Sequence, residues 1–230
     1  NPKAYIRPSP SSGTLGGVAE KTRESMLVCE AAGYDVVIVE TVGVGQSEIA
    51  VHGMTDMYCV LQLPNAGDDL QAIKKGVMER ADLVVINKAD IDPNAATRAQ
   101  AQITSSLRLL GMHGNPDHTT TGALWQPRVL QLSALKGEGV DKFWAAVQQF
   151  QQLQTTNGRL AARREKQSLD WMWERIDAGL KLAFKQHPQV QALLPSMQAQ
   201  VTSGTLAAST AARNLLAAQI HQAPVAIKNE

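Results

Sequence analysis

The sequence has few cysteines, few aromatic residues and no excess of charge of one sign. Its two cysteines, Cys29 and Cys59, belong to no Cys-x-x-Cys pair or cluster with histidine. A disulfide scaffold or a thiolate metal site is therefore not expected, and a reduced, cytoplasmic chain is. The 22 Lys and Arg residues nearly balance the 21 Asp and Glu residues, which leaves a net charge of +1. No general attraction to nucleic acid is predicted.

Long apolar runs are missing as well. The longest, such as Val36 to Val39 and Leu83 to Ile86, have the length of a strand and are far too short to span a bilayer. We therefore expect no membrane segment. The chain is 44% hydrophobic and 19% charged, which is the composition of a folded domain with a core.

Strand and helix patterns alternate in the first two thirds of the chain. This alternation predicts an α/β fold with a mostly parallel sheet, helices on both faces and ligands at the carboxyl ends of the strands. One run, DVVIVE, has the pattern of a central strand buried on both faces. The predicted strands are Asp35 to Glu40, Met57 to Leu63, Asp82 to Asn87 and Arg128 to Leu132. The predicted helices are Val18 to Ala32, about Asp68 to Glu79, Asn94 to Leu110 and Glu138 to Leu153.

Strand patterns stop after Asn157-Gly158, and three helical stripes follow. The first runs from Leu169 to Phe184, the second from Val190 to Val201, and the third includes Leu215 and Ile220. We therefore expect two parts, a partial α/β domain over residues 1–156 and a helical packing module over residues 157–230.

The most specific motif is Asn87-Lys88-Ala89-Asp90, NKxD, at the end of an apolar strand. A carboxylate only accepts hydrogen bonds, and guanine has two adjacent donors, so Asp90 can bind guanine in a way that adenine does not match. Lys88 can lay its stem along the base, and Asn87 can hold the loop in place. Taken alone, NKxD is also compatible with a surface turn.

Two further motifs follow predicted strands. Ser133-Ala134-Leu135 lies one strand and helix after NKxD, where a backbone N–H can meet the guanine carbonyl oxygen. Glu40-Thr41-Val42-Gly43 is an ExxG motif, in which the acid can hold Mg²⁺ through water and the Gly43 N–H can reach a γ-phosphate. A tight glycine turn is the alternative interpretation of ExxG. Because they occur in the order ExxG, NKxD, SAL, the three motifs together are strong evidence for a guanine-nucleotide site.

With these motifs, the strings VIVETVGVGQSE, GDDLQAIKKG, LVVINKAD and LQLSALKGEGV make the chain resemble the methylmalonyl-CoA mutase-associated GTPases of the MeaB, ArgK or MMAA type. The resemblance implies a P-loop GTPase fold, GTP or GDP and Mg²⁺ as ligands, and a homodimer held partly by its C-terminal helices. It implies as partner methylmalonyl-CoA mutase or a related cobalamin-dependent mutase, to which intact adenosylcobalamin is delivered. Carried over by position, Asn87, Lys88 and Asp90 would bind guanine, Ser133, Ala134 and Leu135 would close over it, and Glu40 would act on Mg²⁺.

A phosphate-binding loop is missing from these 230 residues. It needs Gly-Lys followed by Ser or Thr, and none of the 17 glycines is followed by Lys. The family places this loop ahead of the region where the chain begins, so we expect an N-terminal truncation rather than a true loss. Without the amides and the lysine around the phosphates, weak or no GTPase activity is expected of this polypeptide alone.

Three residues are weaker candidates for catalysis. Gln46 is a candidate to position the attacking water, and Lys74 or Lys75 to reach phosphate when the mutase is bound. A helix N-terminal polar residue and a solvated helix face are the simpler interpretations. Two other functions also stay open: a nickel-enzyme maturation GTPase, although the His and Cys clusters typical of it are lacking, and a catalytically inactive partner-binding module.

Overall fold

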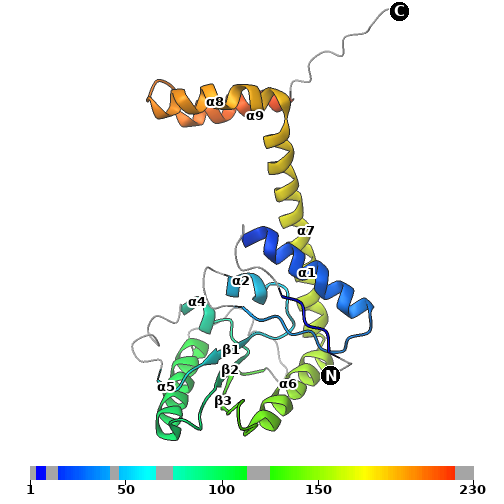
Figure 1. Cartoon of the computed structure of the whole chain (residues 1–230), viewed down its shortest axis with the longest axis vertical. Coiled ribbons are helices and arrows are strands. Elements are labelled where there is room, and N and C mark those ends of the chain that lie inside the picture. The colour runs from blue at the N-terminus through cyan, green and yellow to red at the C-terminus, as the bar shows by residue number, and fades with distance from the viewer. Residues whose placement is uncertain (1–3, 9–14, 42–46, 66–74, 113–124, 221–230) are drawn as a thin grey trace, which may run out of the picture. The chain divides into compact units, whose positions relative to one another are not determined.

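The computed structural model describes residues 4–8, 15–41, 47–65, 75–112 and 125–220. The chain forms two compact units, residues 1–167 and 168–230. The first contains a sheet with helices around it, and the second is helical (Figure 1). The units divide inside a long helix, whereas the expected division falls after residue 156. That functional division stays a prediction.

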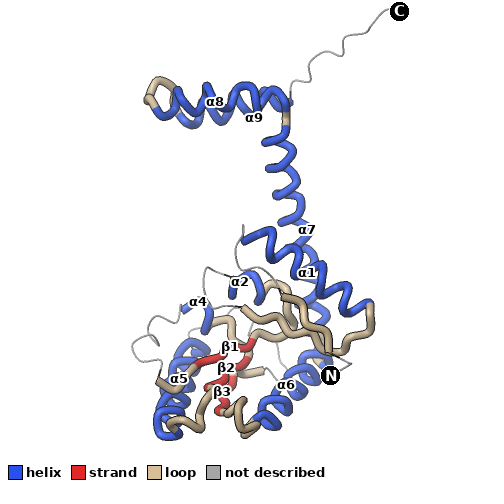
Figure 2. The backbone as a smooth tube through the Cα atoms, viewed as in Figure 1, coloured by secondary structure: helices blue, strands red, loops and turns tan. Residues whose placement is uncertain are grey.

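Three parallel strands form the sheet of the first unit (Figure 2). They are β1 (Cys59–Gln62), β2 (Leu83–Ile86) and β3 (Arg128–Gln131), in the order β1-β2-β3. All are in register, with Cα partners Cys59, Leu83 and Arg128 at their starts. The predicted parallel sheet is therefore confirmed for these three strands.

The two faces of β2 are covered by different helices, because its side chains alternate. Val84 and Ile86 pack with Ala96 and Ile103 of α5 (Pro93–Met112). Leu83 and Val85 pack in a second core with Phe150 of α6 (Val140–Thr156). Figure 1 shows α5 and α6 on opposite sides of the sheet. All four residues of β2 are fully buried, which is typical of a central parallel strand.

Local signals in the sequence explain where α5 begins. The Asp92 carboxylate accepts a hydrogen bond of 2.9 Å from the Ala95 N–H, so it caps the helix. Pro93 takes the first helical position, where its missing N–H costs nothing. The helix predicted from Asn94 to Leu110 is thus confirmed, with slightly wider bounds.

The strand predicted from Asp35 to Glu40 is wrong. The segment has no strand assignment and pairs with no other strand in the described part of the chain. Val36 is 52% exposed and Ile38 is 86% exposed, whereas Val37 and Val39 are half-buried, so one side of this apolar run is not covered by the described residues. A strand requires backbone partners on a neighbouring strand, and apolar character alone does not supply them.

Three further helices precede α5 in the described part of the chain. These are α1 (Leu15–Ala31), α2 (Ser47–His52) and α4 (Lys75–Met78). The helix predicted from Val18 to Ala32 is confirmed by α1. Of the helix predicted over Asp68 to Glu79, residues 68–74 lie outside the described residues.

The helices at the C-terminal end of the chain agree with the three predicted helical stripes. Helix α7 (Arg159–Gln186) is followed by α8 (Pro188–Thr202) and α9 (Ala208–Ile220). Helices α8 and α9 pack on one another. Val190 of α8 and the α9 residues Ala211 and Leu215 are buried. Among the helices described, none has the length and apolarity required to traverse a lipid bilayer.

Candidate functional site

The NKxD and SAL motifs lie side by side at the carboxyl end of the sheet. Asn87 directly follows β2, and Ser133 follows β3 after one residue. The Asn87 N–H donates to the carbonyl of Gln62 at the end of β1, at 2.9 Å. The Ala89 N–H donates to the Leu132 carbonyl at 3.1 Å. The NKxD loop, which leaves β2, is therefore fixed to the ends of the neighbouring strands β1 and β3.

Asn87 joins the two motifs through one side-chain oxygen. Its Oδ1 accepts hydrogen bonds from the Lys88 N–H at 2.7 Å and from the Ala134 N–H at 3.1 Å. Lys88 has a φ of 60°, the left-handed conformation that non-glycine residues rarely adopt. Such strain is characteristic of functional sites, where the surrounding contacts maintain it.

Asp90 has two neighbours that favour its ionised form. The pKa of its carboxyl is held below the ordinary value, first by a hydrogen bond from the Ser133 hydroxyl and further by the charge of Lys136. The Lys136 Nζ lies 3.6 Å from Asp90 Oδ2. The Asp90 side chain is 11% exposed, whereas Ser133 is only 1% exposed. The carboxylate is thus partly accessible, and Ser133 and Lys136 contact it from the protein side.

The SAL loop is closed by a short turn. The Ser133 N–H donates to the Glu138 carbonyl at 2.9 Å, and the two residues form an antiparallel bridge. Gly139 then begins α6 with a φ of 77°. A Cβ at this position would lie 2.6 Å from the Gln131 carbonyl oxygen, so only glycine fits.

Leu135 is at the outer tip of this turn and is 92% exposed. The amides of Ser133, Ala134 and Lys136 donate to other atoms within the site. The Leu135 N–H has no hydrogen-bond partner among the residues that the structure describes. It is therefore the SAL amide that remains available to an acceptor such as the guanine carbonyl oxygen.

The predicted residues thus divide into two groups. Six predicted residues, from NKxD and SAL, lie together at the carboxyl end of the sheet. Glu40 ends the extended, strandless segment and is exposed, at no described contact with that site. Gly43, Gln46 and Lys74 lie outside the described residues, and Lys75 is the first residue of α4, with its side chain not described. The described residues contain no group of three or more His, Cys, Asp or Glu that could hold a metal.

Two residues of the site were not predicted. Lys136 pairs with Asp90, and Gly139 permits the turn that brings Lys136 and Ser133 to the carboxylate. Both lie in the string SALKGEG directly after SAL. The closely spaced glycines were the available signal for a tight turn.

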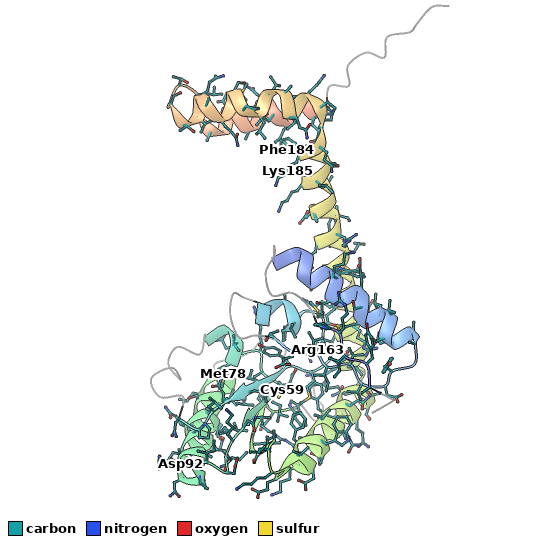
Figure 3. The ribbon with its side chains drawn as sticks, in the orientation of Figure 1. Cys59, Met78, Asp92, Arg163, Phe184 and Lys185 are labelled. Carbon is teal, nitrogen blue, oxygen red and sulfur yellow. The ribbon has the colours of Figure 1, made fainter. Side chains whose placement is uncertain are left out.

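A second polar cluster lies at the opposite, amino end of β2, around Asp82. Asp82 Oδ2 accepts hydrogen bonds from the Tyr58 N–H at 2.8 Å and from Arg163 of α7 at 3.1 Å. Figure 3 labels Arg163 near the start of α7. Burial raises the pKa of the Asp82 carboxyl, and Arg163 opposes this effect. Arg163 also donates to the Asp56 carbonyl.

The end of α2 belongs to the same cluster. His52 Nε2 lies 3.5 Å from Arg163, and burial followed by the Arg163 charge lowers the pKa of His52 to about 4. Gln167 donates to the carbonyls of His52 and Thr55 at 3.3 and 3.0 Å. The neighbouring Arg164 binds Asp56 through both carboxylate oxygens. The first turns of α7 are therefore bound to the sheet-bearing unit by charge and hydrogen bonds.

The chain matches a family of known proteins over most of its length. The family described as methylmalonyl-CoA mutase-associated GTPase MeaB matches residues 1–189. The chain belongs to this family. It is 45% identical over 216 residues to the mouse protein named methylmalonic aciduria type A homolog, mitochondrial, covering 94% of this chain and 50% of that one. It is 49% identical over 175 residues to the Escherichia coli GTPase ArgK, covering 76% and 50% of the two chains.

The fold has a solved counterpart. A crystal structure titled LAO/AO transport system kinase superimposes with a TM-score of 0.67 at 38% identity, over 93% of this chain and 65% of that one. The α/β class predicted for this MeaB-family chain is thus confirmed. The chain spans about half to two thirds of the length of these relatives.

Proposed function

We propose that this chain carries the guanine-binding part of a GTPase. The observation that carries the proposal is the Asp90 carboxylate, which is partly accessible, favoured in its ionised form and contacted by Ser133 and Lys136 of the turn that also carries the Leu135 amide. The two carboxylate oxygens suit the N1 and N2 donors of guanine, and the amide suits its carbonyl oxygen. Adenine has an acceptor at N1 and would cover the carboxylate and the amide without pairing them.

In the complete protein, the GTPase reaction would also require contacts to the phosphates and Mg²⁺. Mg²⁺ prefers oxygen ligands, and the exposed Glu40 carboxylate fits that preference. When bound, the ion would neutralise charge on the phosphates. Gly43, Gln46, Lys74 and Lys75 stay our candidates for the γ-phosphate and the attacking water. In this proposal the residues of this chain bind the base and supply one carboxylate, that of Glu40, for the ion.

The test is calorimetric titration of GDP and GTP, with ATP as competitor, into this chain and into the full-length gene product. We expect micromolar or tighter binding of GDP by the full-length protein and much weaker binding by the isolated chain, because phosphate contacts dominate such sites. ATP should not compete. Exchange of Asp90 for Asn serves as the matched control, since it keeps the size of the side chain. Equal binding of ATP and GTP would refute guanine recognition.

We propose further that the complete protein couples GTP hydrolysis to loading and protection of adenosylcobalamin on methylmalonyl-CoA mutase or a related acyl-CoA mutase. The family to which the chain belongs supports this proposal. The test measures transfer of adenosylcobalamin to the apo-mutase by its absorbance, with GTP, with GDP and with no nucleotide. Transfer that is independent of the nucleotide would contradict the coupling.

We also propose a homodimer formed partly through the C-terminal helices. An apolar stripe on α7 supports this, with Leu169 53%, Trp173 60% and Leu180 61% exposed. A single protein rarely leaves a row of large apolar side chains in water without a function. Sedimentation velocity should give a dimer for the chain, and exchange of Trp173 and Leu180 for Glu should give a monomer.

A further inference from the structure

The ion pair between Lys136 and Asp90 adds a residue to the base-binding site that neither NKxD nor SAL contains. The Lys136 Nζ lies 3.6 Å from Asp90 Oδ2, and the lysine side chain is 51% exposed. At this distance the two groups attract one another by charge without the short contact of a strong hydrogen bond. The pair is therefore compatible with further donors at the same carboxylate.

The position of Lys136 is fixed by its own backbone. Its N–H donates to Ser133 Oγ at 3.2 Å, and the hydroxyl of Ser133 donates to Asp90. The turn that carries Lys136 is closed by the hydrogen bond from the Ser133 N–H to the Glu138 carbonyl. Lys136 and Ser133 thus approach the same carboxylate from one short, closed turn.

The acceptor positions of the carboxylate can then be counted. Two carboxylate oxygens together offer about four lone-pair positions. The Ser133 hydroxyl occupies one and the Lys136 ammonium faces another. The remaining two equal the number of donors that the N1 and N2 groups of guanine present. The protein thus uses two acceptor positions of the Asp90 carboxylate, and the two that remain equal the number of guanine donors.

We infer that Lys136 is a positioning residue for guanine recognition, which holds the Asp90 carboxylate in place for the two donors of the base. The inference rests on the guanine-binding function proposed above. Lys136 is not required to touch the nucleotide, because it acts through Asp90. An alternative in which Lys136 occupies the site and obstructs the base predicts the opposite effect on affinity.

The experiment measures GDP affinity by calorimetry in the full-length protein with Lys136→Met, Lys136→Arg and, as a matched control, Lys142→Met. Lys142 is an exposed lysine of α6, so its exchange removes the same charge elsewhere. Lys136→Met should weaken GDP binding about two- to fivefold, which lies within the range of a half-exposed ion pair. Lys136→Arg should restore most of the affinity, and Lys142→Met should match the wild type.

A purely structural role of Lys136 is separated by a double-variant cycle. In protein that already carries Asp90→Asn, Lys136→Met should leave xanthosine diphosphate binding unchanged, because no carboxylate remains to be positioned. The loss caused by Lys136→Met should also shrink in high salt. An equal loss in both backgrounds would overturn the inference.

The other outcomes are equally decisive. Unchanged GDP affinity in Lys136→Met, with Asp90→Asn still abolishing it, overturns the inference and leaves the proposed function intact. Tighter binding by Lys136→Met also overturns it and shows an obstructing lysine. Failure of the wild type to bind GDP would remove the proposed function and the role of Lys136 with it.

Discussion

Exchange of Arg163 for Met tests whether the polar cluster at the start of α7 stabilises the first unit. The long Met side chain preserves most of the packing of the arginine stem and removes its charge. The Asp82 carboxylate, 16% exposed, would then keep the Tyr58 N–H as its donor and lose its ion pair. A carboxylate left buried without its cation strongly favours unfolding.

The expected loss of stability follows from the burial of the pair. Removing one partner of a fully buried ion pair costs about 3–5 kcal/mol, and because Arg163 is 25% exposed we expect about 2–3 kcal/mol here. This corresponds to a decrease in Tm of roughly 4–12 °C for a chain of this size. Equilibrium unfolding in urea at pH 7, followed by circular dichroism, measures the change in the free energy of unfolding.

The neighbouring Arg164 provides the matched control. Its side chain is 52% exposed and pairs with Asp56, itself 37% exposed. Arg164→Met should therefore cost only about 0–1 kcal/mol. Equal losses in the Arg163 and Arg164 variants would refute the reasoning from burial.

The effect of Arg163→Met should also depend on pH. Burial raises the pKa of Asp82 even with Arg163 present, and removing the arginine raises it further. A carboxyl with a raised pKa binds protons more tightly in the folded state, so its penalty is present at neutral pH and disappears as the pH falls. Loss of Arg163 also removes a charge that lowers the pKa of His52, so protonating His52 costs the variant less stability at low pH than it costs the wild type. The difference between wild type and variant should thus shrink from pH 7 to pH 4, and a constant difference would contradict this account.

Four further exchanges test other parts of the first unit. Asp90→Asn should weaken GDP binding at least about a hundredfold and favour xanthosine diphosphate, whose N1–H and C2 carbonyl match an amide; calorimetry measures both. Gly139→Ala should destabilise the chain by about 2–3 kcal/mol in urea unfolding, because its Cβ would meet a backbone oxygen. Gly137→Ala, whose Cβ has open space, should cost only about 1 kcal/mol. The fold lowers the pKa of His52 from 6.5 to about 4, so between these pH values the unfolded chain binds a proton that the folded chain does not. The free energy of unfolding of the wild type should therefore fall by on the order of 1–2 kcal/mol from pH 6.5 to pH 4. His52→Gln should abolish this part of the pH dependence.

The meeting of NKxD and SAL at one edge of the sheet was predictable, because it depends on local patterns and one rule of topology. Each motif follows an apolar run, and parallel neighbouring strands place their carboxyl ends at one edge of the sheet. The contact between Asn87 and Ala134 follows from that arrangement. Lys136 was missed because its ion pair depends on the geometry of a turn, which spacing along the sequence does not encode.

The failed strand shows the limit of the same approach. DVVIVE is as apolar and β-branched as the run that forms β2, yet only the latter is paired on both edges. Ile38 is 86% exposed, whereas Ile86 is fully buried. Composition predicts that a segment is suited to a sheet. Whether it joins one depends on partners elsewhere in the chain, which a local pattern cannot identify.

The two polar clusters of the first unit lie at opposite ends of β2, the buried central strand of the sheet. Asp82 precedes β2 and Asn87 follows it, and the four residues between them are fully buried and paired on both edges. At about 3.3 Å per residue, the clusters are more than 10 Å apart and share no side-chain partner in the described structure. Effects at such distances usually add independently. Arg163→Met should therefore lower stability without changing the preference for guanine, and Asp90→Asn should do the reverse. A change of both properties in either variant would show that β2 transmits strain between its two ends.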